Sequence, residues 1–480
     1  MKAALKSSSK LSPTRLEDGD GKDSDMPPKP EQSDLGEAVE IEDAVFGQIT
    51  REGPNYRNVG WVGTVALMVK QQFGLGVLGI PDVLNTLGMI PGVICILCIA
   101  CITTWSCYTV GAFKRRHPEV YGIDDAVGKM LGRIGKEAFA VSLCIYWTFC
   151  AGSGMVSTAT GLNAISSHAT CTAVFVVVAA IAAFLISSIR TLSRMTWAAW
   201  AGVITVCIAV IMVTIAVGIQ ERPSAAPQTG PWKSDWKLVG NPSFTEAVSA
   251  IATTIFSFSG VPGFFPIVAE MRNPAFYNRA LFTCQAFVTS MYIAVGCVVY
   301  YYCGSYVASP ALGSAGKLIK KVAYGIALPG LLVSGVIVYH FASKYIFVRA
   351  LRGSKHLTSN TFTHWAVWLG STFGVGVVAY IIASGIPVFG ALVSLIGALF
   401  GTLMSFQPLG CMWLYDNWSR GKTRPTPRWY MMVAWSVFVI VSGTFLMVAG
   451  TYGSIVGIID LNKANGGSAA WSCADNSNSS

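Results

Sequence analysis

The stretch KQQFGLGVLGIP, residues 70–81, decides how the rest of the sequence is interpreted. It lies in an apolar run long enough to cross a membrane, yet it holds three glycines within six residues and ends on a proline. In a helix interior glycine costs roughly 1 kcal/mol and proline roughly 3 kcal/mol relative to alanine. We therefore expect an interrupted membrane helix, and unwound backbone is tolerated in a bilayer only where protein buries it or it lines a cavity.

A second interruption is predicted in IFSFSGVPGFFP, residues 255–266, where two glycines and two prolines fall within seven residues. Either cluster alone is typical of helix packing or of a kink. The two clusters, however, lie in the first and sixth of the predicted spans, so each opens a unit of five spans. An odd number of spans gives the two units opposite orientations, and paired broken helices in inverted repeats are typical of a transporter with its substrate site near the bilayer midplane.

Apolar runs of the length that crosses a ~30 Å hydrocarbon core recur along the chain. Hydrophobic residues make up 53% of the sequence and charged residues 12%, with a mean hydropathy of +0.53, which excludes an ordinary soluble protein. We predict an all-α polytopic membrane protein with repeats at 60–218 and 245–413 and an extra helix at 431–453. The eleven spans are 60–80, 88–111, 138–162, 171–189, 196–218, 245–268, 280–304, 322–343, 365–384, 386–413 and 431–453.

Loop charge predicts the orientation of these spans. With the N-terminus inside, the inner loops hold 18 Lys and Arg and the outer loops hold 6, as the positive-inside rule requires. The net charge of +10 is thus a topology signal that points to the lipid bilayer, and no dense basic patch indicates nucleic-acid binding. We expect an integral protein of the plasma membrane with a cytoplasmic N-terminus and an extracellular C-terminus.

The two ends of the chain differ from the transmembrane domain, 60–453. Residues 1–59 are polar and hold twelve of the 24 acidic residues, which predicts a disordered cytoplasmic tail. Residues 454–480 form a short extracellular tail. Ten of the 13 cysteines lie in the interior of predicted spans, Cys171 and Cys303 lie near the outer ends of theirs, and Cys473 lies in the outer tail. A disulfide among these last three is left open.

The two breaks predict the chemistry of a substrate site. A half-helix N-terminus offers free N–H groups that suit a carboxylate, and a half-helix C-terminus offers carbonyls that suit an ammonium group or a cation. A site with both suits an α-amino acid. The predicted binding residues are Gly74, Leu75 and Gly76 as donors in span one, and Phe256, Ser257, Phe258 and Ser259 as carbonyls and hydroxyls in span six.

The side wall of this site is predicted to be aromatic. Tyr146 and Trp147 fall at the middle of span three, span six contributes Phe256 and Phe258, and no acidic or basic group besides Lys70 is expected near them. An apolar wall without a counter-charge suits neutral side chains, although aromatic residues at this spacing also pack between helices.

Three charged residues are candidates for coupling or gating. Lys70 lies one helical turn before the first break, where it either titrates during transport or reaches back to the interface. Glu270 and Arg272 end span six as an inner gate pair or a solvated loop end, and His340 is a weaker proton-relay candidate. Span eight offers Ser334 and Ser343 without an adjacent Thr, which favours H⁺ over Na⁺ as the coupling ion. No metal or other cofactor is predicted.

The sequence resembles a known family. The motifs that carry the resemblance are GLGVLGIPDVLNTLGMIPGV (74–93), IFSFSGVPGFFPIVAEMRNP (255–274), HPEV (117–120) and SPALGSAGKLIKKVAYGIALPG (309–330). Together they are similar to the amino acid/auxin permease family, within the amino acid–polyamine–cation superfamily, over about 55–453. The match is closer to the fungal neutral amino acid permeases of the methyltryptophan-resistance type. The resemblance implies a five-plus-five inverted-repeat (LeuT-like) fold and proton-driven uptake of neutral aliphatic and aromatic amino acids, while the Val-Pro-Gly at 261–263 departs from the commonest pattern.

The leading hypothesis is a proton-coupled transporter of neutral amino acids, with no enzyme activity and no predicted oligomeric state. A transporter of another solute, such as auxin, a polyamine or a purine, is the first alternative, although a polyamine would favour buried carboxylates. A nutrient-sensing receptor on the same fold is a second alternative. An intramembrane enzyme is a third, but the five histidines are scattered and no metal motif is present.

Overall fold

The computed structural model describes residues 41–43, 47–49, 57–190, 192–223, 226–227, 229–386, 388–423, 425–464, 471 and 473–477. Most of the predicted cytoplasmic tail therefore lies outside the described residues, as does much of the tail after residue 464. Within the first tail, β1 (Ile41–Asp43) and β2 (Gly47–Ile49) pair as a short antiparallel ladder.

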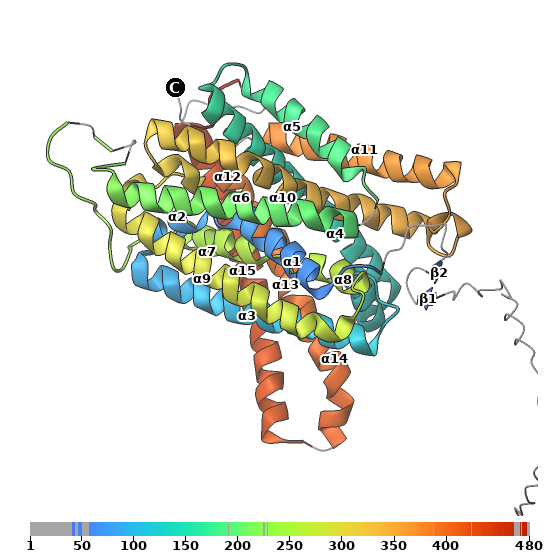
Figure 1. The fold of residues 1–480 in the computed structure, drawn as a ribbon. Coiled ribbons are helices and arrows are strands. Elements are labelled where there is room, and N and C mark those ends of the chain that lie inside the picture. Colours follow the sequence, from blue (N-terminus) through green and yellow to red (C-terminus); the bar gives the residue numbers. More distant parts are fainter. Residues whose placement is uncertain are drawn as a thin grey trace, which may run out of the picture. The chain divides into compact units, whose positions relative to one another are not determined.

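Helices form nearly all of the remainder (Figure 1). They are α1 Trp61–Gly76, α2 Ile80–Leu87, α3 Met89–Arg116, α4 Ile123–Ser166, α5 Thr172–Ser187, α6 Leu192–Ile219, α7 Phe244–Phe258, α8 Val261–Ala269, α9 Tyr277–Cys303, α10 Lys317–Leu351, α11 Phe362–Gly385, α12 Phe389–Ile396, α13 Thr402–Ser405, α14 Gln407–Thr423 and α15 Pro427–Ala464. Short 3₁₀ turns occur at Pro274–Phe276, Gly304–Tyr306, Ala311–Ser314 and Lys355–Leu357, and a π-helical turn, η5, at Gly397–Gly401.

The membrane-spanning character of the chain is confirmed, and the number of spans is partly confirmed. Among the described residues nine helical segments are long and apolar enough to cross a membrane, and α1 with α2, bent by 51°, makes a tenth. The remaining predicted span corresponds to α5, which has only 16 residues, so the count of eleven stays a prediction.

Several helices extend beyond their predicted limits. Helix α4 begins at Ile123 rather than near 138, α10 covers both ends of its predicted span, and α15 continues to Ala464. Gly132 in α4 has a positive φ of 73°, a backbone conformation that glycine tolerates, and it kinks the charged segment that precedes the apolar part of the helix. In these helices the apolar run thus predicted the membrane-embedded part, and the helix continues beyond that part.

The break in span one falls slightly later than predicted. Helix α1 continues through Gly76, and residues 77–79 separate it from α2, where Pro81 occupies the first turn. Gly74 and Gly76 are part of the helix, and the absence of a side chain at each lets residues of neighbouring helices pack closely against them. A Cβ at Gly74 would lie 1.9 Å from Ser334 Oγ, and one at Gly76 would lie 2.8 Å from Ser257 Cα.

The break in span six is confirmed at its predicted place. Helix α7 ends at Phe258 and α8 begins at Val261, with Pro262 in its first turn, where a missing N–H costs nothing. The N-terminus of α7 is a capping box in which Ser243 and Glu246 satisfy each other's backbone N–H groups.

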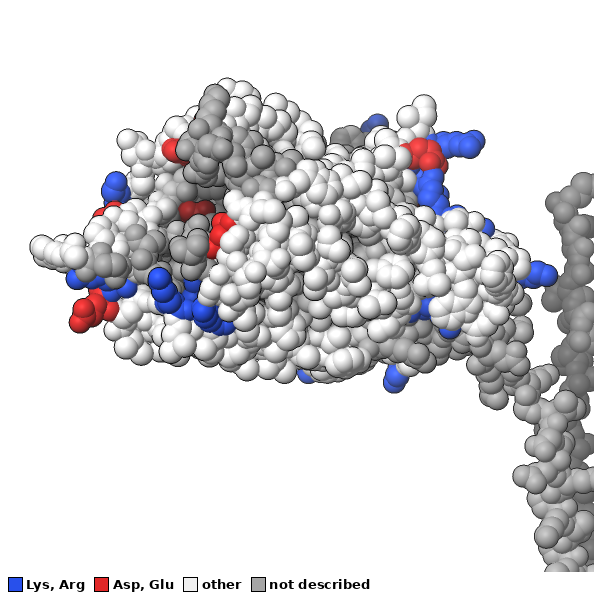
Figure 2. Space-filling view, turned by 90° about the horizontal axis from the view of Figure 1, so that it is seen from above, with Lys and Arg blue, Asp and Glu red and all other residues white. Residues whose placement is uncertain are grey.

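The broken helices lie at the centre of the helical domain. Figure 1 shows α1, α7 and α8 in the middle, with the long helices α3, α4, α6, α9 and α10 running alongside. Helix α10 packs along α4 and α6, and α1 packs against α6, α7, α9 and α10. Lys, Arg, Asp and Glu side chains gather toward the two ends of the helices and leave the middle of the visible surface uncharged (Figure 2), as hydrocarbon requires.

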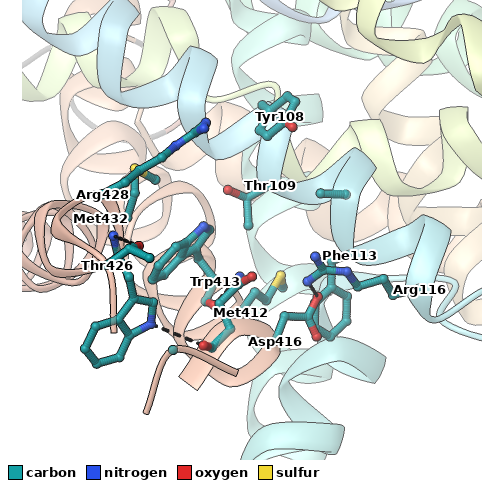
Figure 3. Close-up of a pocket in the computed structure, with 14 residues that line it drawn as sticks. Tyr108, Thr109, Phe113, Arg116, Met412, Trp413, Asp416, Thr426, Arg428 and Met432 are labelled. Atoms are coloured by element: carbon teal, nitrogen blue, oxygen red, sulfur yellow. Dashed lines mark hydrogen bonds and ion pairs between the residues drawn. The ribbon is translucent and has the colours of Figure 1, made fainter. Parts of the chain in front are cut away.

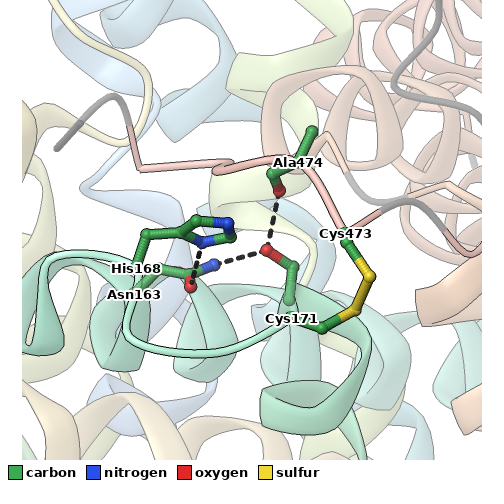
Figure 4. Close-up of a disulfide and its surroundings, with 6 residues drawn as sticks. Asn163, His168, Cys171, Cys473 and Ala474 are labelled. Carbon is green, nitrogen blue, oxygen red and sulfur yellow. Dashed lines mark hydrogen bonds between the residues drawn. A yellow bond between two sulfur atoms is a disulfide. The ribbon is translucent and has the colours of Figure 1, made fainter.

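A disulfide fixes the C-terminal tail to the helical domain. Cys473 is bonded to Cys171 across 302 residues, and Cys303 is a free, buried thiol. The neighbouring Thr172 Oγ1 donates a hydrogen bond to Ala474 O at 2.7 Å, and Asn163 Nδ2 donates to Thr172 Oγ1 at the same distance (Figure 4). Both cysteines belong to segments predicted to lie outside the cell, where a disulfide persists.

Differential alkylation tests this pairing. When free thiols are blocked under denaturing, non-reducing conditions and the protein is then reduced and alkylated with a second reagent, we expect mass spectrometry to find the second label on Cys171 and Cys473. Cys303 serves as the internal control and should carry the first label. The second label on Cys303 would contradict the structure.

Candidate functional site

The two helix breaks meet at a close contact between α1 and α7. Ser257 Oγ, in the last turn of α7, lies 3.1 Å from Gly76 O and 2.9 Å from Thr253 O, and its single proton donates to one of these carbonyls at a time. The missing side chain of Gly76 permits this approach, because a Cβ there would also lie 2.4 Å from Tyr292 Oη. The structure thus brings together the residues predicted for span one and span six.

Three consecutive carbonyls at the end of α7 each accept a side-chain hydrogen bond from a different helix. Tyr292 Oη of α9 donates to Ser257 O at 2.9 Å, and Gln72 Nε2 of α1 donates to Phe258 O at 3.4 Å. Tyr146 Oη of α4 donates to Ser259 O at 2.5 Å. These carbonyls lie where the helical ladder is interrupted. Phe258 O also accepts from the backbone Gly260 N at 2.9 Å, whereas the side chains of Tyr292 and Tyr146 supply the donors to Ser257 O and Ser259 O.

One of these side chains is shared between two carbonyls, and another has an unused acceptor. Tyr292 Oη also lies 2.9 Å from Gln72 O, but a hydroxyl has one proton and donates to one carbonyl at a time. Gln72 is buried, and its Oε1 accepts no hydrogen bond within the described part of the chain. The site therefore contains a buried acceptor for an additional donor.

The predicted aromatic residues separate into two groups. Tyr146 reaches the span-six break and packs against Phe400 of the π-helical turn, with ring centroids 6.5 Å apart. Trp147 instead packs against Phe341 and Tyr345 of α10. Its Nε1 has no hydrogen-bond partner within the described part of the chain. Only Tyr146 of this pair bonds to the backbone of a break.

The other predicted residues of the breaks are also buried. Leu75 and Phe256 are 7% and 9% exposed, and Phe258 is fully buried with its ring against that of Tyr292, at a centroid distance of 5.1 Å. Ser259 Oγ donates back to Ile255 O. Together these side chains form an apolar and aromatic surround for the polar backbone at the end of α7.

Lys70 is buried and does not reach the interface. Its Nζ donates a hydrogen bond to Gly202 O of α6 at 3.2 Å, and its side chain is 1% exposed. The Cβ position of Gly74 lies 3.1 Å from Lys70 Nζ and 1.9 Å from Ser334 Oγ, so the ammonium group lies between α1, α6 and α10. Because Gly74 has no side chain, both Lys70 Nζ and Ser334 Oγ can lie close to it.

Glu270 and Arg272 do not pair with each other. Glu270 forms a buried ion pair with Lys344 of α10 at 2.5 Å, with side chains 1% and 2% exposed. Arg272 donates to Asn58 Oδ1, and Arg272 N and Glu270 O bond to the backbone of Val59 in a short parallel bridge. The chain before α1, the end of α8 and the scaffold helix α10 are thus held together at one end of the broken helices.

At the other end of the broken helices a cavity of about 370 Å³ lies between α2, α7, α12 and α15. It is lined by Asp82 and Glu246 and by the hydroxyls of Ser249 and Thr253. Asp82 was not among the predicted residues because the predicted span ended at residue 80, whereas α2 continues to Leu87.

Other residues of the site were overlooked for a different reason. Tyr292, Gln72 and Lys344 each contact a partner more than 30 residues away in the sequence. They are polar residues in apolar runs, and no other feature of the local sequence predicts these contacts. His340 is buried against Trp368, within the scaffold helices α10 and α11, and belongs to neither break.

Two broken helices that meet inside a bundle of long apolar helices define a membrane transporter of the inverted-repeat class. The fold is similar to a Na⁺-coupled sialic acid symporter, with a TM-score of 0.54 at 11% identity over 85% of this chain and 92% of that chain. It is also similar to MhsT in complex with L-phenylalanine, with a TM-score of 0.52 at 12% identity over 83% and 98% of the two chains.

The sequence comparisons define the family. The chain belongs to the family described as transmembrane amino acid transporter protein, whose model matches residues 57–456. It is 36% identical to a transmembrane transporter of Gibberella moniliformis, over 89% of this chain and 90% of that protein. It is 30% identical to the N amino acid transport system protein of Neurospora crassa, over 87% and 89% of the two chains. The resemblance to fungal amino acid permeases is thereby confirmed, and the protein is a transporter rather than an enzyme.

The buried Glu270–Lys344 pair generates a stability prediction. Lys344→Met should destabilise the protein by about 3–5 kcal/mol because it leaves a carboxylate buried without its cation. The double variant Glu270→Gln/Lys344→Met should regain most of this loss, which thermal unfolding in detergent would measure. Lys355→Met, at an exposed position, is the control. Equal stability of Lys344→Met and the control would contradict the buried pair.

Proposed function

We propose that this chain is a secondary active transporter of neutral amino acids, aliphatic and aromatic, that works by alternating access in symport with protons. The observation that carries the proposal is the meeting of the two breaks, where the buried carbonyls at the end of α7 lie beside the end of α1 at Gly76. The family, and the name of the Neurospora relative, support an amino acid as the substrate.

The α-carboxylate would bind at the first turn of α2. The N–H groups of a first helical turn have no partner within the helix, and the positive end of the helix dipole favours an anion. Helix α2 begins at Ile80, directly after the break. Gly74, Leu75 and Gly76, the donors expected from the sequence, lie in the last turn of α1, so their N–H groups point back into that helix. Leu78 N and Gly79 N donate to carbonyls of α1, and Pro81 has no N–H, so the donors left for a carboxylate are those of Ile80 and Asp82.

The α-ammonium group would bind at the end of α7. It would displace a side-chain donor from one of the three capped carbonyls and donate to the free Oε1 of Gln72. The bond from Gln72 to Phe258 O is the longest of the three, at 3.4 Å, which makes it the easiest to exchange. The side chain of the substrate would face Phe256, Tyr146 and Phe400, which offer no counter-charge and suit neutral groups.

Lys70 would couple transport to protons. A lysine in a membrane interior costs roughly 2.5–3.5 kcal/mol on insertion scales, and this one faces a carbonyl rather than a carboxylate. A group in that position gains or loses a proton readily when its surroundings change between the outward and inward states. The ammonium also lies between α1 and α10, where a Na⁺ ion would have to bind, so it disfavours Na⁺ coupling.

The orientation belongs to the same proposal. The bias of 18 inner against 6 outer Lys and Arg supports a cytoplasmic N-terminus, and the Cys171–Cys473 disulfide supports an extracellular C-terminal tail at the plasma membrane. Glu270 and Arg272 would then help to close the cytoplasmic side.

Uptake by the purified protein in liposomes tests the function. We expect accumulation of labelled neutral amino acids when an inward proton gradient is imposed, and none of arginine, glutamate or spermidine. Accumulation that requires a Na⁺ gradient would contradict proton coupling. No uptake of any neutral amino acid by correctly folded protein would contradict the proposed substrate.

Gln72 is the sharpest test of the ammonium site. Gln72→Leu should raise KM for the amino acid about tenfold, equivalent to about 1.4 kcal/mol, with a smaller change in maximal rate. The matched control is Gln285→Leu, because Gln285 is also buried with an unpartnered Oε1 but bonds to Cys107 Sγ, between α9 and α3. If both variants keep the KM of the wild type, the amide of Gln72 is no ligand.

Lys70 is the test of coupling. Lys70→Met keeps the apolar volume of the side chain but removes the titratable group, so uptake should lose its response to the imposed pH gradient. Counterflow exchange at equal pH should persist, because it needs no net proton movement. Lys129→Met, which removes an exposed ion pair with Glu119, should leave the pH response unchanged. A wild-type pH response in Lys70→Met would rule out coupling at this residue.

A further inference from the structure

A second cavity lies away from the helix breaks, where the end of α3 meets α14 and the start of α15. Its volume is about 420 Å³ (Figure 3). In Figure 1, α14 and α15 extend together from the helical domain, and this cavity lies between them and α3. None of its lining residues belongs to the site described above.

The wall of the cavity is mostly aromatic and apolar. Its main side chains are Tyr108, Phe113, Met412, Trp413, Trp429 and Met432. Trp429 packs closely over Gly421, where a Cβ would lie 1.9 Å from the indole Nε1, and that Nε1 donates to Asn417 O at 3.2 Å. These contacts fix the position of Trp429, so this wall of the cavity is an ordered surface.

The charge of the cavity is positive. Asp416, its only lining carboxylate among the described residues, is paired with Arg116 and with His117, each at 3.0 Å. Arg428 also lines the cavity, is exposed, and forms no hydrogen bond or ion pair with another described residue. Figure 3 shows Arg428 and Arg116 on opposite sides of the Trp413 ring. One guanidinium is thus left without a counter-ion.

The surroundings place this cavity at a membrane interface. Large side chains on the flanking helices point outward and are about half exposed: Tyr108, Tyr415, Trp418, Tyr430 and Met431. Trp and Tyr concentrate at the level of the lipid headgroups. The end of α14, the start of α15 and the residues that join them carry four cations without an acidic residue: Arg420, Lys422, Arg424 and Arg428. This is the pattern of the cytoplasmic side, where the bilayer is rich in anionic lipid.

We propose that this cavity binds the headgroup of an anionic phospholipid, with the phosphodiester on Arg428 and the glycerol and upper acyl chain against Trp413 and Trp429. Basic pockets between membrane helices are suited to such headgroups. A guanidinium matches phosphate oxygens in two-point hydrogen bonds. Free inorganic phosphate would use the arginine but not the aromatic wall, so the wall favours a lipid. The bound lipid would link α3 to the α14–α15 pair.

Lipid retention tests the proposal. Wild-type protein is reconstituted in nanodiscs of phosphatidylcholine with a minor share of phosphatidylserine and then returned to detergent, and the retained phospholipid is counted by native mass spectrometry. We expect phosphatidylserine to be enriched in the wild type and reduced at least fivefold in Arg428→Ala. Arg133→Ala is the matched control, because Arg133 is an exposed cation of another predicted inner segment and does not line the cavity. Equal retention in both variants would overturn the proposal.

Two further experiments test which ligand binds and whether the aromatic wall contributes to binding. Dioctanoyl phosphatidylserine should raise the melting temperature of the wild type, and inorganic phosphate at the same concentration should not; equal effects would mean a simple anion site and overturn the lipid assignment. Trp413→Ala should lose the lipid effect even though Arg428 is present. If Trp413→Ala proves unfolded, Trp413→Leu in the same assay decides the role of the wall. The proposal does not depend on the transported substrate, so it can fail while amino acid uptake is intact.

Discussion

The structure depends on satisfying the backbone at an interruption inside the membrane. Hydrocarbon offers no hydrogen bonds, so the carbonyls at the end of α7 must find donors within the protein. Those of Ser257, Phe258 and Ser259 find them on α9, α1 and α4, respectively. Because each donor comes from a different helix, the break in α7 fixes the relative positions of these helices, and the close contact at Gly76 follows from it.

The same arrangement explains how a binding site can be stable when empty and still accept a ligand. A neutral hydrogen bond contributes roughly 0.5–1.5 kcal/mol net, so the three caps protect the carbonyls without locking them. A charged donor such as an ammonium group bonds about twice as strongly. In the proposed site it would therefore replace a side-chain donor at little cost, and Gln72 Oε1, which accepts no hydrogen bond within the described part of the chain, would accept one from the ammonium group.

The sequence predicted what local composition controls. Gly and Pro weaken helices wherever they occur, so both breaks and their matching places in the two repeats could be predicted. The exact unwound residues could not, because Gly74 and Gly76 serve contacts with Ser334 and Ser257, which lie far along the chain. The donors on Tyr292 and Gln72, the Glu270–Lys344 pair and the choice of Cys473 as the partner of Cys171 depend equally on tertiary contacts, which no local pattern reveals.

The buried Glu270–Lys344 ion pair and the buried Lys70 are suited to different roles. Glu270 and Lys344 bury opposite charges side by side, so moving them together transfers no net charge. Lys70 is buried against a carbonyl, and its charge is not balanced by a carboxylate contact. One elementary charge moved across 100 mV is worth about 2.3 kcal/mol, so a movement of this lysine, or of its proton, is sensitive to the membrane potential. Under the proposed mechanism the ion pair would therefore hold one end of the transporter closed, and Lys70 would couple transport to the gradient.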